Sequence, residues 1–450
     1  MLPRKEKVML YTAVPRLFRT TYIGYVYEIA QEFPFILLAE ELDPESNKVL
    51  KNKRLFPFLE KVIPIDQYTG KKRKLWESHL YFSRLAKKII EEYKPNIIIG
   101  GSIVNSFEKY LFRYGRLSGA ITLAFQAGFQ ASSWDKVNLR SYLLWRDTPK
   151  NLKLPIYIRE LKLGIVKLTE HIKEVIDFWV MPTLIGTDPY LNKSLFHYGI
   201  DGWVREFDYS VVFSDKEVSV ERQMGRPRDK IMILTHPLLR KSRHIFEKAY
   251  HMPKIGIDKK LQKNITVMID VNTSGHRRDN FQFISESEYL KSRINTIKLM
   301  SNILSDWKIF VKPHPTTKRD NFSFLKKYFE KHAKNIIIVD PMEPADKYIT
   351  LSHIIVGFPT PSTTLLTAMF QDPSKIIIYL DLFHEYLGDE FKNYPLINTI
   401  ESLKNLKRLI IDIKNNKYKP KSVSVSKQEY KSAADILNKV IKLKGISIQK

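Results

Sequence analysis

The sequence predicts an α/β protein made of two successive units, each with buried parallel strands and covering helices. Short runs of isoleucine, leucine and valine recur along the chain and stop at polar or glycine-containing turns, as buried strands do. Amphipathic segments separate many of these runs, which is typical of the crossover helices of parallel sheets. The pattern restarts after residues 240–263, a basic segment with a proline and a glycine that we interpret as a linker.

The first unit is predicted from its strand runs and two helical segments. Strands are expected at residues 7–14, 34–38, 59–65, 95–101, 120–126, 178–181, 209–213 and 231–234. Helices are expected at residues 22–33 and 75–93, the second with a clear apolar stripe. Residues 136–168 are rich in Leu, Tyr, Trp and Arg and predict further helices that decorate this unit.

The second unit repeats the alternation and ends in an amphipathic helix. Strands are expected at residues 265–269, 308–312, 335–339, 354–357 and 375–380, and helices at 286–304, 321–332, 343–351, 361–370, 402–413 and 429–443. We therefore predict a Rossmann-like domain over residues 1–245, a second over 246–425, and a C-terminal helix within 426–450 that packs back.

Composition excludes several classes of protein. The 450 residues include no cysteine, which rules out disulfides, thiolate catalysis and cysteine-ligated zinc. The start of the chain lacks the apolar stretch of a signal peptide, and no window approaches the ~18 apolar residues of a membrane span. We therefore expect a cytoplasmic protein. The net charge of +26 favours anionic partners, although solvated surface lysines are the simpler explanation.

A histidine between two prolines ends one strand of the second unit. Lys312, Pro313, His314 and Pro315 follow the apolar run at residues 309–311. Ligands of open α/β sheets bind beyond the carboxyl ends of the strands. His314 could donate a proton or hydrogen bond to a leaving phosphate there, and Lys312 adds positive charge. The alternative is a histidine that only satisfies a strand-end carbonyl.

A hydroxyl-rich segment follows another strand of the same unit. Pro361 suits the first turn of a helix, and Ser362, Thr363 and Thr364 would present hydroxyls and free backbone N–H groups at its N-terminus. Simple helix capping explains these residues equally well. We expect this segment and His314 to lie side by side on adjacent strand ends, facing one cleft.

These two segments carry a resemblance to a known group of enzymes. The His-Pro and Pro-Ser-Thr-Thr motifs resemble those of GT-B glycosyltransferases of surface polysaccharide assembly: bacterial sialyl- and polysialyltransferases, capsule Kdo transferases and CDP-glycerol glycerophosphotransferases. In those families the motifs bind the cytidine nucleotide of the donor, which assigns that role to Pro315, Pro361, Ser362, Thr363 and Thr364. Many relatives carry Ser-Ser where this chain has Pro-Ser-Thr-Thr.

The resemblance extends to one turn and implies the architecture. Residues 340–344 look like the GT-B turn that receives the base and ribose, so Met342 and Glu343 are predicted nucleotide contacts. For Glu343 the alternative is an acidic residue favoured by the dipole of the helix it begins. The implied fold is GT-B, with two Rossmann-like domains facing a cleft.

The acceptor side is less defined by the sequence. Gln126 and Gly128 lie in a loop that follows a predicted strand of the first unit and should face the cleft. Transfer to a hydroxyl usually needs a base, expected from the first unit. Glu108, Asp135 and Asp188 follow strand ends or loops there, and each is equally explained as a surface or capping residue.

The predicted function is metal-independent glycosyl transfer from a nucleotide-activated donor to a glycan or lipid-linked acceptor, with His314 as the catalytic residue. CMP- or CDP-type donors are favoured and UDP is the alternative; no cofactor or metal is expected. The sequence contains no Asp-x-Asp and no P-loop motif. A sugar-nucleotide 2-epimerase of the same fold stays open. A nucleic-acid-binding protein is prompted by charge alone, and no nucleic-acid module is recognised.

A basic segment suggests a further partner. Residues 71–74 are Lys-Lys-Arg-Lys, and the following helix carries Arg84, Lys87 and Lys88. Such a surface could rest on an anionic membrane, where lipid-linked acceptors reside. The protein would then be peripheral on the inner face of the membrane. The alternative is a core-packed helix with a solvated basic rim.

Overall fold

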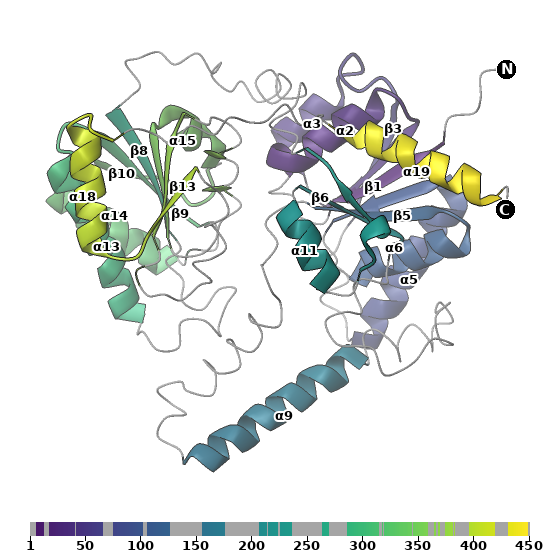
Figure 1. Ribbon diagram of the computed structural model, residues 1–450, viewed down its shortest axis with the longest axis horizontal. Helices are drawn as coiled ribbons and strands as arrows, with labels where there is room; N and C mark the ends of the chain where they lie inside the picture. The colour runs from purple at the N-terminus through teal and green to yellow at the C-terminus, as the bar shows by residue number, and fades with distance from the viewer. Residues whose placement is uncertain are drawn as a thin grey trace. The chain divides into compact units, whose positions relative to one another are not determined.

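The chain forms two compact units in the computed structural model (Figure 1). Unit 1 combines residues 1–130, 166–251 and 427–450, and unit 2 combines residues 131–165 and 252–426. The structure describes residues 6–12, 18–40, 42–65, 75–101, 106–126, 155–175, 207–213, 215–223, 226–235, 263–269, 286–314, 317, 319–343, 345–358, 364–365, 368–369, 374–380, 382, 396–418 and 431–448. The predicted strand at residues 178–181 lies outside this part of the chain.

Unit 1 is built on a parallel seven-stranded sheet in the order β3-β2-β1-β4-β5-β6-β7. Its strands are β1 (Val8–Thr12), β2 (Phe35–Ala39), β3 (Leu59–Pro64), β4 (Ile97–Gly100), β5 (Ile121–Phe125), β6 (Tyr209–Val212) and β7 (Ile231–Ile233). β1 and β2 are buried along their whole length, which explains their continuous apolar sequence. Strand order reverses between β1 and β4, so their carboxyl ends form the switch point where such sheets bind ligands.

Helices cover both faces of this sheet. They are α2 (Ile23–Ala30), α3 (Pro44–Leu50), α5 (Leu75–Tyr93), α6 (Ser106–Leu117), α11 (Asp215–Gln223) and α19 (Ala433–Ile448), with the short turns η1 (Phe18–Tyr22) and η4 (Arg228–Lys230). Phe82 and Ile89 of α5 and Phe107 of α6 pack on Met9 and Ile98 of the sheet. α5 is therefore a core-packed helix, and its Arg84, Lys87 and Lys88 form an exposed basic rim.

The C-terminal helix α19 belongs to unit 1. The Ala433 N–H donates to Glu28 Oε2 at 2.9 Å, and Asn438 Nδ2 donates to Glu32 Oε2 at 3.1 Å. Lys444 Nζ donates to the Gly119 carbonyl at 2.9 Å. Figure 1 shows this yellow helix beside the purple α2. The prediction that the C-terminal helix packs back is confirmed.

Unit 2 repeats the strand order of unit 1. Its parallel six-stranded sheet has the order β10-β9-β8-β11-β12-β13. The strands are β8 (Asn264–Ile269), β9 (Lys308–Pro313), β10 (Ile336–Ile338), β11 (Ile354–Phe358), β12 (Ile376–Leu380) and β13 (Ile397–Ile400). β8 takes the place of β1, β9 that of β2, and β11 that of β4. The switch point of unit 2 therefore lies between β8 and β11.

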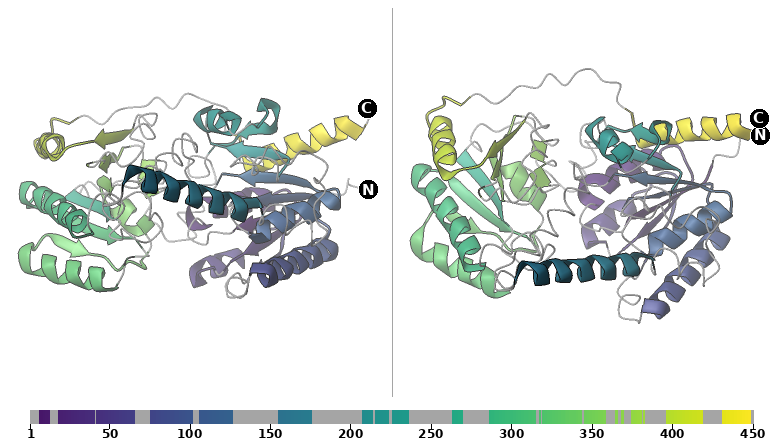
Figure 2. Two further views of the ribbon diagram at one scale, coloured as in Figure 1. Left: turned by 90° about the horizontal axis from the view of Figure 1, so that it is seen from below. Right: turned by 60° about the horizontal axis from the view of Figure 1, so that its bottom comes forward.

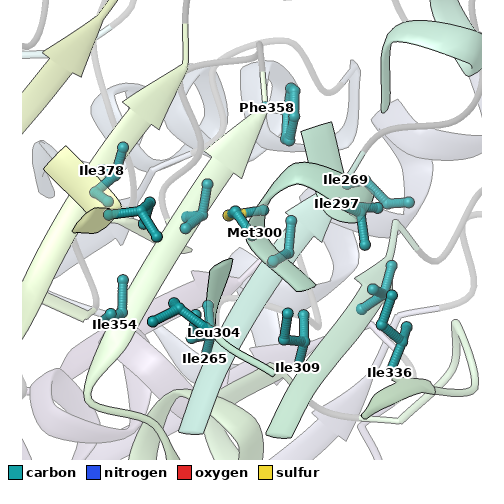
Figure 3. Packing of buried hydrophobic residues seen from close by; sticks show 14 of the residues in the cluster. Ile265, Ile269, Ile297, Met300, Leu304, Ile309, Ile336, Ile354, Phe358 and Ile378 are labelled. Atoms are coloured by element: carbon teal, nitrogen blue, oxygen red, sulfur yellow. The ribbon is translucent and has the colours of Figure 1, made fainter. Parts of the chain in front are cut away.

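One face of this sheet holds an apolar cluster (Figure 3). Side chains of β8, β9 and β11 such as Ile265, Ile309 and Ile354 pack under Ile297 and Met300 of a covering helix. The helices of unit 2 include α13 (Glu286–Ile303), α14 (Arg319–His332), α15 (Ala345–Leu351) and α18 (Leu403–Lys414), of which α13, α14 and α18 contribute to this cluster. Burial of this kind contributes roughly 25 cal/mol for each Å² of apolar surface.

One further helix, α9 (Ile156–Val175), is a single unbroken helix of 20 residues (Figure 2). It begins within residues 136–168, where further helices were predicted, and extends seven residues beyond residue 168. Among the described residues, no helix is both long enough and apolar enough to cross a membrane.

Candidate functional site

Three strand ends meet at the carboxyl edge of the unit 2 sheet. Ile269 of β8 is in register with Pro313 of β9 on one side and with Phe358 of β11 on the other. The His314 N–H then donates to the Ile269 carbonyl at 2.9 Å. His314 and the segment that follows Phe358 therefore flank the end of the central strand at the same level.

The prediction that these two segments lie on adjacent strands is wrong. β8 lies between β9 and β11, because the chain builds this sheet outward from β8 in both directions. Neighbouring strands are ~4.8 Å apart, so the β9 and β11 backbones are about 10 Å apart. The two segments suit a ligand with two anchoring points better than one phosphate held by both.

His314 itself is half-buried at the end of β9. Its carbonyl accepts a hydrogen bond from the Thr317 N–H at 2.9 Å, which closes a tight turn directly after the strand. This turn and the bond to Ile269 fix the backbone on both sides of the imidazole. Pro315 lies outside the described residues.

Lys312 stabilises the carboxyl edge of the unit 2 sheet from the protein interior. Its side chain is buried, and Nζ donates to the Pro313 carbonyl at 2.8 Å and to the Pro341 carbonyl at 2.7 Å. The ammonium thus ties the end of β9 to the turn after β10. The predicted direct contact to a nucleotide stays a prediction, and the structure gives Lys312 a positioning role.

The turn after β10 presents Met342 on a rigid frame. The Met342 N–H donates to Asp340 Oδ1 at 2.7 Å, and the Glu343 N–H donates to the Asp340 carbonyl at 3.1 Å. The Met342 side chain is 74% exposed. It is therefore accessible for an apolar contact with a base.

Glu343 is held ionised beside this turn. Its Oε2 accepts hydrogen bonds from the Tyr348 hydroxyl at 2.6 Å and from Lys347 Nζ at 3.1 Å. The bond from Tyr348, and next that from Lys347, hold the pKa of Glu343 below its ordinary value. The carboxylate can therefore accept hydrogen bonds, such as those from ribose hydroxyls, down to acidic pH.

The segment after β11 is described only in part. Pro361, Ser362 and Thr363 lie outside the described residues, and Thr364 is a half-buried residue in helical conformation. The next residue, Leu365, packs so closely on the strand that a Cβ at Gly357 would lie 2.7 Å from its Cδ1. The described residues 364–365 are helical, within the helix predicted over residues 361–370; its N-terminus lies outside the described residues, and the anion site there stays a prediction.

Arg293 is a candidate that the sequence did not reveal. It is fully buried on α13, and its guanidinium lies 4.4 Å from the ring centroid of Phe358, the last residue of β11. A permanent positive charge therefore lies next to the switch point of unit 2. No local pattern distinguishes this arginine from the others of an amphipathic helix.

The corresponding edge of unit 1 places Gln126 in a structural role. Gln126 is buried; its Oε1 accepts from the Phe213 N–H at 2.8 Å, and its Nε2 donates to Glu217 at 3.4 Å. Its backbone carbonyl accepts from the Tyr25 hydroxyl at 2.7 Å. The side chain joins β5 to β6 and α11, so its predicted role facing an acceptor stays unsupported by these contacts. Gly128, Asp135 and Asp188 lie outside the described residues.

Glu108 and Tyr22 form a buried polar pair at the switch point of unit 1. Glu108 Oε1 accepts from the Gly101 N–H at 2.6 Å, so this carboxylate fixes the glycine turn after β4. Burial, and next the charge of Glu108, raise the pKa of Tyr22 far above its ordinary value. Its phenol stays protonated. Within the described part of the chain, the Tyr22 hydroxyl and Thr12 Oγ1 have no hydrogen-bond partner.

Glu40 occupies the place in unit 1 that His314 has in unit 2. It follows the last residue of β2, and its N–H donates to the Thr12 carbonyl at 3.3 Å, as the His314 N–H donates to Ile269. The half-buried carboxylate accepts a hydrogen bond from the Tyr11 hydroxyl at 3.3 Å. The rule that selected His314, a polar residue directly after an apolar strand, could have selected Glu40 too.

Comparison with known proteins identifies the architecture. No protein-family model matches the sequence, and neither does any curated protein. Among solved structures, UDP-GlcNAc 2-epimerase from Methanocaldococcus jannaschii is similar with a TM-score of 0.57 and 11% identity, covering 97% of this chain and 99% of that chain. The enzyme from Neisseria meningitidis, solved with UDP-GlcNAc bound, is similar with a TM-score of 0.54 and 11% identity, covering 97% of this chain and 99% of that chain.

A third epimerase, from Rickettsia bellii, gives a TM-score of 0.52 with 11% identity, covering 97% of this chain and 95% of that chain. The chain has the GT-B fold. The predicted fold class, α/β with two Rossmann-like sheets, is therefore confirmed. The resemblance to particular transferase families stays a prediction.

Proposed function

We propose that the chain is a glycosyltransferase that holds a nucleotide-sugar donor at the edge of unit 2 and an acceptor hydroxyl at the edge of unit 1. One observation carries the proposal. Two sheets of the same strand order carry opposite chemistry at equivalent edges: His314 and Arg293 in unit 2, Glu40 and Glu108 in unit 1. A phosphate is attracted by the first edge and repelled by the second.

The spacing in unit 2 supports a nucleotide diphosphate or a similarly extended donor. Its anchors would be His314 on one side of β8 and the Ser362 segment with Arg293 on the other. The turn at Met342 and Glu343 lies beyond β9, on the far side of His314 from β11. A base and ribose at this turn would place the phosphates toward the switch point.

Unit 1 supplies the groups for the acceptor. Glu108 and Glu217 are 1% and 2% exposed, with their carboxylates hydrogen-bonded to Gly101 and Gln126. Glu40 is the more accessible carboxylate at this edge, and we assign it the role of the base that takes the acceptor proton. A glycan or a lipid-linked glycan has the hydroxyls for this edge; a bare anion does not fit it.

A thermal-shift screen tests the donor site. CMP, CDP, UDP, GDP and their sugars are added in turn, and binding at a hundred times Kd should stabilise the folded protein by about 2.7 kcal/mol. His314→Ala should reduce the response. His332→Ala is the matched control, because His332 ends α14 in the same unit ahead of the amino end of β10. Equal responses in both variants would remove His314 from the site.

The structural comparisons favour one second candidate, a sugar-nucleotide 2-epimerase. The similar epimerases match this chain over nearly its whole length. Inverting C2 requires the bond between C2 and its hydrogen to break. Incubation with UDP-GlcNAc in D2O should then introduce deuterium at C2 and yield a second sugar without any acceptor. Product formation that depends on an added glycan, with no exchange at C2, supports the transferase.

A further inference from the structure

We infer that α9 is a dimerisation helix that pairs in parallel, and in register, with α9 of a second copy of this chain. The inference rests on the exposed residues of the helix and on their spacing. Large apolar side chains are exposed along one side of α9, at 65% for Leu161, 55% for Ile165, 59% for Leu168 and 49% for Ile172. Single exposed leucines are ordinary in soluble proteins, but a continuous row marks an interaction surface.

The spacing of this row is that of a coiled coil. Together with the half-buried Ile158, these residues recur at intervals of three, four, three and four positions. Isoleucine occupies every first heptad position in the row and leucine every fourth. This arrangement favours two-stranded parallel coiled coils. We call these five residues the α9 seam.

The length of α9 suits pairing with another helix. At 20 residues α9 is about 30 Å long, which is long enough for a marginal helix to gain stability from pairing.

Charge also favours a second copy. The chain as a whole carries a net charge of +26, yet α9 has four basic and three acidic residues. A membrane-binding helix would concentrate lysine and arginine on its polar face. In a parallel pair the flanking positions bring Tyr157 opposite Lys162, so no like charges face each other there.

The first test is the molar mass of the intact protein, measured by light scattering during gel filtration. The wild-type chain should elute as a dimer, and Leu161→Glu with Leu168→Glu should halve the mass. Lys162→Glu is the control: it changes the net charge equally, by two units, and leaves the seam intact, so it should stay dimeric. Circular dichroism checks that the variants keep their helix content.

The second test uses the absence of cysteine from the chain. Leu168→Cys places one thiol in the seam, and a parallel pair in register brings the two copies of residue 168 face to face. Mild oxidation should give a disulfide-linked dimer, whereas Glu160→Cys on the outer side of the helix should give little. Failure of Leu168→Cys to cross-link would overturn the parallel arrangement.

Other outcomes would replace the second copy with another occupant. A monomeric wild-type chain that binds phosphatidylserine vesicles, with binding lost in the double variant, would assign the seam to a bilayer. A monomer whose double variant melts at a lower temperature would assign the seam to another segment of the same chain. Each of these results overturns the dimer.

Discussion

The two units solve the same packing problem at the switch point with different chemistry. β4 has the sequence Ile-Ile-Ile-Gly and β11 has Ile-Ile-Val-Gly, and each glycine lets a following segment approach the strand closely. A Cβ at Gly100 would lie 1.9 Å from Glu108 Oε1, and a Cβ at Gly357 would lie 2.7 Å from Leu365 Cδ1. The contact is a buried carboxylate in unit 1 and an apolar side chain in unit 2.

This difference shows how one topology can carry two kinds of side chain at equivalent strand ends. The Glu108 carboxylate accepts a hydrogen bond from the Gly101 N–H in the glycine turn of unit 1. Under the proposed function, it would also repel an anion from that edge. The apolar contact in unit 2 adds no charge, and the Arg293 guanidinium lies over the ring of Phe358 at the end of the same strand. β4 and β11 have similar sequences with a glycine at or near the end, yet the charged side chain near the end of each strand has the opposite sign.

The largest effect should come from replacing Glu40, the accessible carboxylate at the carboxyl edge of the unit 1 sheet. Glu40→Gln should lower turnover about 10²–10⁴-fold, because a positioned base contributes that much, while donor binding stays unchanged. Glu60→Gln, on an exposed carboxylate of β3, is the control. Turnover with the donor found by thermal shift measures the effect. Normal turnover in Glu40→Gln would break the assignment of unit 1 to the acceptor.

The two glycines offer a direct comparison of stability. Gly100→Ala should destabilise unit 1 by about 4 kcal/mol, through overpacking and loss of the hydrogen bond to Glu108. Gly357→Ala should cost about 2 kcal/mol, since the end of a leucine can move. Gly445→Ala, where a Cβ would meet open space, should be neutral or stabilising. Denaturant unfolding measures all three, and equal losses at Gly100 and Gly357 would contradict the contrast.

Replacing one buried arginine in each unit should distinguish an effect on nucleotide binding from an effect on the stability of the fold. Arg293→Met should weaken nucleotide binding about 10- to 150-fold, since a hydrogen bond to a charged group contributes roughly 1.5–3 kcal/mol. Arg226 of unit 1 is buried over Phe207 and paired with Glu221 at 3.1 Å. Arg226→Met should destabilise the fold without changing the affinity for nucleotide, which calorimetry would measure. Unaltered affinity in Arg293→Met would give that arginine a purely structural role.

The smallest effect concerns the pKa of Glu343. Tyr348→Phe should raise this pKa toward its ordinary value, because the Tyr348 hydrogen bond is the main cause of its depression. A depressed pKa stabilises the fold above the unfolded-state value, and this contribution is lost as pH falls through the folded-state value. The loss should therefore begin at higher pH in the variant. A carbon NMR titration, assigned with Glu343→Gln, measures it; an unchanged pKa would mean that Tyr348 contributes nothing.

Much of the fold was predictable because burial leaves a local mark. The predicted helix at 75–93 coincides with α5, and the predicted strands at 265–269 and 354–357 lie within one residue of β8 and β11. α3, α6, α11 and β13 were missed. β13 has only four residues, Ile-Asn-Thr-Ile, which neither alternate nor form a continuous apolar run and so give no clear pattern.

The candidate site was predictable only in part. His314 was found because a polar residue after an apolar run marks a strand end, and the same rule would have found Glu40. Arg293 and Tyr22 left no such signal, since their burial depends on partners distant in sequence. Lys312 was expected near the ligand, but its ammonium donates hydrogen bonds to two backbone carbonyls and thereby connects the end of β9 to the turn after β10.

The sequence by itself determined which segments become strands, which carry charge, and where polar residues end an apolar run. These properties follow from periodicity over a few neighbouring residues. Only the tertiary structure decided that β8 separates His314 from the Ser362 segment and that the two glycine strands face different partners. Strand order depends on the direction of each crossover, a long-range choice that leaves no trace in the spacing of neighbouring side chains.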